Sequence, residues 1–135
     1  MDPLSISASV AGLITLTGSC LKLSRKWIGP SEFSTSDLKA IEKALYEFNG
    51  VIMTFETHLK IHEDDVARLN SLNYLKPALD QCNMALEVIR EFVGGCSLIG
   101  KHVIGPKFDR KLKASLKALD GAKELFMLAL QGDQL

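Results

Sequence analysis

The sequence predicts an all-α protein, a bundle of about four amphipathic helices around one hydrophobic core. Three observations lead to this fold class. Apolar residues recur at steps of three and four over long segments, which is the spacing of one helix face. No segment shows two-residue alternation flanked by turn signals, which argues against strands. The 135 residues, 47% of them hydrophobic, suffice for one domain that needs neither disulfides nor a metal.

The first predicted helix occupies the opening of the chain, where no charged residue occurs from Pro3 to Leu21. Asp2 suits its N-cap and Pro3 its first position. A secretory signal peptide is disfavoured, because the positive charges follow the apolar stretch, from Lys22, instead of preceding it. A membrane span would be long enough, since nineteen residues rise about 28 Å. Eight of the nineteen are Ser, Thr or Gly, however, so a single copy would insert poorly.

Seen along its axis, this opening helix has two different faces. The apolar face gathers Ile6, Val10, Leu13, Ile14, Leu21 and Ile28. The other face gathers Ser5, Gly12, Thr15, Gly18, Ser19, Lys22 and Lys26, most of them small instead of charged. Small side chains let helices approach closely in water or in lipid. Two interpretations stay open: a tightly packed first helix of the bundle, or a helix that is soluble in one state and associates within a membrane in another.

The second predicted helix covers residues 38–59. Ser36 and Asp37 supply an N-terminal cap and a favourable acid in the first turn. Its apolar row has no gap and consists of Leu38, Ile41, Leu45, Phe48, Ile52, Phe55 and Leu59. This row must be buried against other helices.

The third predicted helix carries the apolar row Leu72, Leu75, Leu79, Cys82, Leu86, Ile89 and Val93. Gly94-Gly95 follows directly and predicts the end of the helix there. Pro77 leaves two possibilities near the start. Either the helix begins close to Pro77, or an earlier piece from about Asp65 is kinked at the proline.

The fourth predicted helix runs from about Asp109 to Gly132. Its apolar row consists of Leu112, Leu116, Leu119, Ala122, Phe126 and either Ala129 or Leu130. A loop containing four glycines is expected between Gly94 and Pro106. Four amphipathic helices with short connections must bury their apolar faces against one another, which predicts the bundle.

Cysteine spacing and charge distribution narrow the classes of function. Cys20, Cys82 and Cys96 fit neither a disulfide framework nor a paired metal motif, so we expect a reducing compartment. Sixteen acids and sixteen bases leave no net charge, but the bases are concentrated in two places. One group is Lys22, Arg25 and Lys26; the other is Lys101, Lys107, Arg110, Lys111, Lys113 and Lys117.

Three motifs bear on chemistry, and none supports an enzyme, a metal or a cofactor. The run GGCSLIGKH approximates a phosphate-binding loop, but His102 stands where Ser or Thr would hold magnesium, and helical periodicity precedes it. His58 and His62 lie one turn apart, but the run HLKIH lacks a metalloprotease Glu and a third zinc ligand. The basic run KFDRKLKASLK has only Phe108 as an interleaved aromatic, so we expect no nucleic acid. A solvated face, anionic lipid or an acidic partner remains possible for that run.

A resemblance to a known family adds to these observations. The opening MDPLSISASVAGLITLTG resembles the start of the HeLo-like N-terminal domains of fungal NLR-like receptors, commonly written MDPLS followed by small and apolar residues. The Leu79-x-x-Cys82 pattern, the basic stretch entering the fourth helix and the ending LFMLALQGD agree with it. The family's aromatic-proline step before the fourth helix is present only in part, as Ile104-Gly105-Pro106. The resemblance covers the whole chain, and we expect residues 1–135 to form one HeLo-like domain cut from a longer protein.

The resemblance implies a cell-death effector. HeLo domains and the similar four-helix domain of the mixed-lineage kinase-like necroptosis effector attack the plasma membrane when they are clustered. By this likeness we expect a cytoplasmic domain that oligomerises under an upstream NLR-like or amyloid-motif partner, relocates to an anionic plasma membrane and permeabilises it. The alternative is a non-lytic interaction module that regulates such a receptor.

The resemblance together with the helical pattern gives two sets of candidate residues. The membrane-inserting set is Leu4, Ile6, Val10, Gly12, Leu13, Ile14, Leu16, Gly18 and Leu21. The set expected to contact lipid head groups is Lys22, Arg25, Lys26, Lys107, Arg110, Lys111, Lys113 and Lys117.

Overall fold

The computed structural model describes residues 3–28, 36–99 and 106–132. Backbone alone is described at the helix ends 3–5, 26–28, 36–38, 95–99 and 106–109. The elements are α1 (Pro3–Ile28), α2 (Ser36–Ile61), α3 (Val66–Asn70), the 3₁₀ turn η2 (Asn73–Leu75), α4 (Lys76–Ile99) and α5 (Pro106–Gly132). The described chain contains helices and no strand, so the predicted all-α helical bundle is confirmed.

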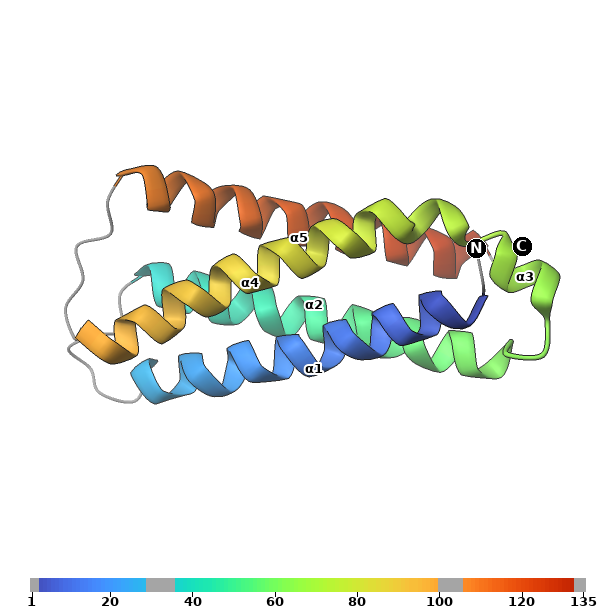
Figure 1. Cartoon of the computed structure of the whole chain (residues 1–135), viewed down its shortest axis with the longest axis horizontal. Helices are drawn as coiled ribbons and strands as arrows, with labels where there is room; N and C mark the ends of the chain where they lie inside the picture. Colours follow the sequence, from blue (N-terminus) through green and yellow to red (C-terminus); the bar gives the residue numbers. More distant parts are fainter. Residues whose placement is uncertain (1–2, 29–35, 100–105, 133–135) are drawn as a thin grey trace.

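The four long helices are arranged so that α1 and α5 lie diagonally across the bundle (Figure 1). The helix α1 packs against α2 and α4, and α5 packs against the same two helices. Consecutive long helices run in opposite directions (Figure 1). Since α2 and α4 are also diagonal partners, the chain must cross one end of the bundle between them.

The crossing is made by α3 and η2, which cover that end of the core. Asp65 caps α3, its carboxylate accepting a hydrogen bond from the Arg68 backbone N–H. Leu69, Leu72 and Leu75 from the crossing are all buried. The short helix is therefore held by its cap and by tertiary packing, because five residues are too few for a stable isolated helix.

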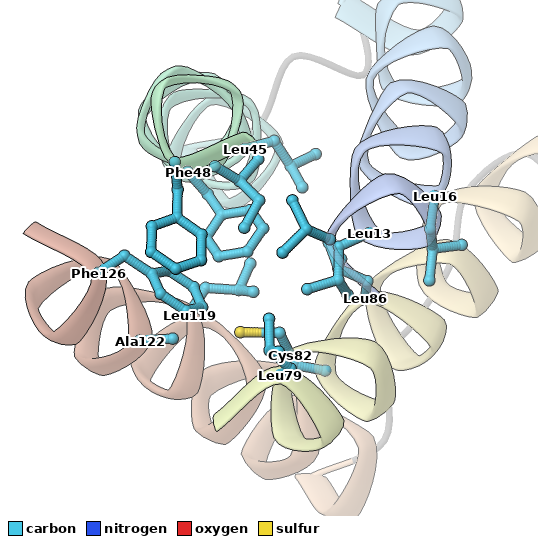
Figure 2. Packing of buried hydrophobic residues seen from close by; sticks show 14 of the residues in the cluster. Leu13, Leu16, Leu45, Phe48, Leu79, Cys82, Leu86, Leu119, Ala122 and Phe126 are labelled. Atoms are coloured by element: carbon cyan, nitrogen blue, oxygen red, sulfur yellow. The ribbon is translucent and has the colours of Figure 1, made fainter. Parts of the chain in front are cut away.

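The core is built from the apolar rows that the sequence predicts. Every member of the row from Leu72 to Val93 is buried, and so is every α2 member from Ile41 to Leu59. Leu72 and Leu75, predicted with the third helix, precede α4 and belong to the crossing. Phe126 of α5 lies between two α2 rings, 5.1 Å from the Phe55 centroid and 6.5 Å from that of Phe48 (Figure 2). These aromatic contacts join α2 to α5.

Two predicted boundaries need correction and one alternative is settled. Gly94 and Gly95 do not end the third long helix, since α4 continues to Ile99. Two glycines cost a helix only about 1 kcal/mol each, and each added residue of an established helix brings one more hydrogen bond. The fourth helix begins at Pro106, three residues before the predicted start at Asp109. Pro77 lies in the first turn of α4, so the helix starts there and is not kinked.

Candidate functional site

The apolar side of α1 is docked into the bundle. Ile6 and Val10 are fully buried and Leu13 is 2% exposed, whereas Ile14 is half-buried at the edge. Leu16, Cys20 and Leu21 extend the buried surface. The candidate residue Leu4 lies within α1, but its side chain is outside the described part. The membrane-inserting candidates thus include most of the residues that hold α1 to α2 and α4.

Cys20 anchors α1 to α4 near the middle of the contact. Its side chain is fully buried, and its thiol lies 3.5 Å from the Leu86 carbonyl oxygen, to which it donates a weak hydrogen bond. Burial raises the pKa of the Cys20 thiol to about 11 and that of Cys82, on α4, to about 12. Both cysteines are free and buried, as the sequence predicts for small apolar residues in a helix row.

Three hydroxyl groups of α1 donate hydrogen bonds within the helix itself. The Thr17 hydroxyl, which is fully buried, donates to the Leu13 carbonyl at 2.6 Å. The Ser24 hydroxyl donates to the Leu21 carbonyl oxygen at 3.0 Å. The exposed Thr15 hydroxyl donates to the Ala11 carbonyl oxygen at 3.1 Å. These bonds move with the helix, so the hydroxyls need no water when α1 enters an apolar environment.

The small-residue side of α1 faces solvent. Ala8, Ala11, Gly12, Thr15, Gly18 and Lys22 are exposed, and Ser19 is half-buried. A Cβ added at Gly12 or at Gly18 would meet no atom within 4 Å. The tight packing of α1 in the bundle therefore uses the apolar side alone, and the small side is left open for another helix.

A groove of about 340 Å³ borders this open side, between α1 and α4. Ser9, Gly12 and Leu13 line it from α1; Leu79, Asp80, Asn83 and Met84 line it from α4. The Met84 side chain is 70% exposed. Leu13 is buried, but it lines this groove and so lies close to the surface.

By length and composition, one helix in the described part of the chain could cross a membrane: α1, over Ile6–Arg25. Within this segment only 39% is buried inside the bundle. A core helix or an N-terminal signal sequence would meet the same criterion, so this property by itself is weak evidence.

The described residues of the two basic groups lie in the last turns of α1 and the first half of α5, toward the same end of the bundle (Figure 1). Their described side chains are exposed: Lys22 and Arg25 on α1, and Arg110, Lys111, Lys113 and Lys117 on α5. We call these six residues the basic end. Lys26 and Lys107 have no described side chains. The opposite end carries the exposed acids Glu63, Asp64 and Asp65, so the separation of charge seen along the sequence also runs along the bundle axis.

Arg25 ties the end of α1 to α2. Its guanidinium donates a hydrogen bond to the Tyr46 hydroxyl and lies 5.3 Å from the centroid of the same ring. The sequence pattern gives no sign of this partner, because Arg25 and Tyr46 are far apart in the chain and both are largely exposed.

The motifs that suggest other chemistry receive no new support. Gly95 belongs to α4, whereas a phosphate-binding loop needs a strand before it; Lys101 and His102 lie outside the described residues. His58 and His62 lie close together, with ring centroids 4.6 Å apart. Among the described residues no His, Cys, Asp or Glu group of three or more could hold a metal ion.

A second groove lies between α2 and α5. It has a volume of about 500 Å³ and is lined by Tyr46, Glu47, Gly50, Val51, Thr54, Lys123, Met127 and Leu130. Lys123 forms an ion pair with Glu47 across it at 2.9 Å, and the pKa of Lys123 is raised by that hydrogen bond. The sequence did not predict this groove, since it depends on which two helices become neighbours.

Comparison with known proteins identifies no relative: no family model, no curated protein and no solved structure matches this chain.

Proposed function

We propose that this chain is a non-enzymatic, HeLo-like cell-death effector domain that permeabilises membranes through α1 once it is clustered. The observation that carries the proposal is the division of α1 into a docked apolar side and an open side of small residues, on which the Thr15 hydroxyl is bonded to its own helix. A helix that only served the core would be expected to carry charges on its open side.

Docking keeps the inactive chain soluble. Five large aliphatic side chains of α1 are buried: Ile6, Val10, Leu13, Leu16 and Leu21. At about 1.5–3 kcal/mol each, their exposure to water would cost about 8–15 kcal/mol, which is comparable to the whole stability of a small domain. Release into water is therefore negligible, and release into lipid becomes feasible because the same side chains again meet an apolar environment.

Clustering solves the problem that one copy is too polar to insert. When several α1 helices enter together, the sides that carry Ala8, Gly12 and Thr15 can pack against one another, which small residues allow in lipid. The remaining Ser and Thr hydroxyls are then covered by neighbouring helices or by their own backbone. Oligomerisation by an upstream NLR-like or amyloid-motif partner would provide this local concentration.

The basic end would hold the domain on an anionic membrane. Each Lys or Arg near such a surface contributes about 1 kcal/mol at physiological ionic strength. Lys22 and Arg25 directly follow the apolar part of α1, so they would stay at the head groups while residues before Leu21 enter the lipid. The domain would be cytoplasmic when inactive and would move to the plasma membrane on activation.

The experiment uses the chain fused at its C-terminus to a ligand-induced oligomerisation domain. Dye release is measured from vesicles containing phosphatidylserine and from vesicles of phosphatidylcholine alone. We expect release from the anionic vesicles only after the inducer is added. A clustered chain that releases no dye from anionic vesicles would show the proposal to be wrong.

Gly12→Glu and Gly12→Ala form the matched pair of variants, because Gly12 is exposed and a Cβ added there meets no atom within 4 Å. A carboxylate in the middle of an inserted helix costs about 2.5–3.5 kcal/mol per copy, roughly a hundredfold in the insertion equilibrium. Gly12→Ala keeps the open side small and apolar. We expect the first variant to lose dye release and the second to keep it, with equal helix content and thermal stability no lower than that of the parent chain in both.

The groove between α2 and α5 favours one alternative function, a non-lytic interaction module. Met127 lines this groove and is 44% exposed, and flexible methionines suit adaptable binding surfaces. Under this alternative, Met127→Lys would abolish recruitment of a partner, and the dye-release assay would show no activity for any variant.

A further inference from the structure

A cluster of three potentially cationic side chains lies where α2 meets α3. His58 and His62 are one turn apart at the end of α2, with ring centroids 4.6 Å apart and planes inclined by 52°. Arg68 of α3 approaches from the other side, its Nη2 lying 3.5 Å from Nε2 of His58. The Phe55 ring stacks on the His58 ring, with the two ring centroids 6.4 Å apart. The cluster thus joins the last turn of α2 to the short helix that follows it.

The contact between Arg68 and His58 is compatible with only one protonation state of the histidine. A guanidinium has N–H donors and no acceptor. His58 must therefore present an unprotonated Nε2 to accept from Arg68. When His58 gains a proton, two donors and two positive charges face each other, with the His62 ring close by.

The pKa of His58 is lowered from its usual 6.5, first by burial and then by the charges of His62 and Arg68. A histidine whose pKa is lowered by folding contributes stability that is present above pH 6.5 and is lost as the pH falls through the folded-state value. Between Pro3 and Leu21, α1 has no charged side chain to place at this end of the bundle. The nearby acids Glu63, Asp64 and Asp65 are exposed, and Asp65 is the cap of α3.

The position of the cluster gives its protonation a structural consequence. The helix α3 packs against α1 as well as carrying Arg68, and it lies at the end of the bundle where α1 begins (Figure 1). It is only five residues long, and its hydrogen bonds are those of a single turn, such as Leu69 N–H to the Asp65 carbonyl at 3.0 Å. Elements of this kind open at lower free energy than the long helices.

We infer that His58, His62 and Arg68 form an acid-sensitive latch: at neutral pH it holds α3 against the end of the bundle, and on acidification it lets α3 open and uncovers the start of α1. This inference does not rest on the proposed membrane activity. The hydrogen-exchange test below can fail or succeed independently of the vesicle experiments.

The test is amide hydrogen exchange of the unfused chain between pH 7.5 and pH 5.5, with rates corrected for the intrinsic effect of pH. We expect protection of the amides from Leu69 to Leu75 to fall on acidification, by up to about tenfold for each unit by which folding lowers the His58 pKa. Amides in the middle of α4, which exchange through global unfolding, should lose protection by no more than the same factor. Equal protection of the Leu69–Leu75 amides at both pH values would overturn the inference.

Two substitutions and a titration make the assignment specific. His58→Gln removes the titrating group and should abolish the pH effect, whereas loss of the third histidine in His102→Gln should leave it intact. Arg68→Gln should raise the His58 pKa, followed by NMR through its ring protons, because one of the three causes of the lowered value is removed. The titration remains decisive if His58→Gln proves unstable: an unchanged His58 midpoint in Arg68→Gln would refute the cluster.

Discussion

Replacement of Leu13 by alanine tests directly whether α1 is docked through the side that the structure assigns. Leu13 is 2% exposed and lies in the core cluster, near Leu86 in Figure 2. Its neighbour Gly12 is exposed, with no atom within 4 Å of an added Cβ. The two adjacent positions therefore predict opposite effects of alanine on the free energy of unfolding.

The magnitude at Leu13 follows from the space that the missing atoms leave. Buried Leu→Ala substitutions cost about 2–5 kcal/mol, and the cost rises with the volume of the cavity left behind. Because Leu13 lines the groove between α1 and α4, the space it vacates can be reached from the surface and partly filled. We therefore expect a loss in the lower half of the range, about 2–3.5 kcal/mol. Gly12→Ala should stabilise by about 0.5–1 kcal/mol, through helix propensity alone.

The assay is equilibrium unfolding in urea, followed by helix content, with thermal unfolding as a second measure. For a domain of this size 1 kcal/mol corresponds to about 3–4 °C in Tm, so Leu13→Ala should unfold about 6–14 °C below the parent chain. Gly12→Ala should unfold slightly above it. If both variants matched the parent chain, α1 would not be packed in the core, and the account of its release would have no basis.

Two further predictions concern the buried thiols and the basic end. Because burial raises the thiol pKa of Cys20 to about 11 and of Cys82 to about 12, only about one Cys20 thiol in a thousand is ionised at pH 8. Both thiols should therefore react with a disulfide reagent only as fast as the chain unfolds in urea, and rapid labelling without denaturant would contradict their burial. Lys22→Gln with Lys117→Gln should weaken binding to anionic vesicles about tenfold or more in sedimentation at physiological salt, since each base contributes about 1 kcal/mol. Lys76→Gln, at the other end of the bundle, should have no effect. A weakening by Lys76→Gln as large as that by the double variant would refute a localised basic end.

Much of the fold could be predicted from periodicity. A helix that must bury one side repeats its apolar residues at steps of three and four, and from Leu72 to Val93 each residue chosen on that rule is buried. Fold class follows from such rows because several of them can be covered only by one another. The order of the helices around the bundle does not follow, since the rows are similar and the diagonal crossing from α2 to α4 depends on the segment between them.

The errors of prediction fall where local preference competes with packing. Gly94-Gly95 is a strong local signal for a helix end, but it only weakens α4, which continues to Ile99. A helical piece from about Asp65 is one of two alternatives in the sequence, but periodicity cannot define α3 because five residues span little more than one turn. Its sign in the sequence is the single cap Asp65.

The candidate site was predictable in its composition but not in its environment. The sequence shows that Gly12 and Gly18 share a side with Thr15, and the structure adds that this side is open. Thr17 would be taken for a polar surface residue, yet it is fully buried, because a hydroxyl that bonds to its own helix can lie against apolar neighbours. The last turns of α1 and the first turns of α5 are about 80 positions apart in the sequence, and only the antiparallel course of the helices brings their bases to one end (Figure 1).

The central claim is that α1 leaves the bundle and enters lipid when the chain is clustered. An environment-sensitive fluorophore on Gly18→Cys, in a Cys96→Ser background that keeps the buried Cys20 and Cys82, reports on α1. The same probe on Gly121→Cys reports on α5; both glycines are exposed and have no atom within 4 Å of an added Cβ, so the sites are matched.

On anionic vesicles carrying lipid-bound quenchers, the account predicts that the inducer shifts the Gly18 probe to shorter wavelength and quenches it, while the Gly121 probe remains in water. Dye release with the Gly18 probe still in water would contradict the account, because the membrane would then be damaged without α1.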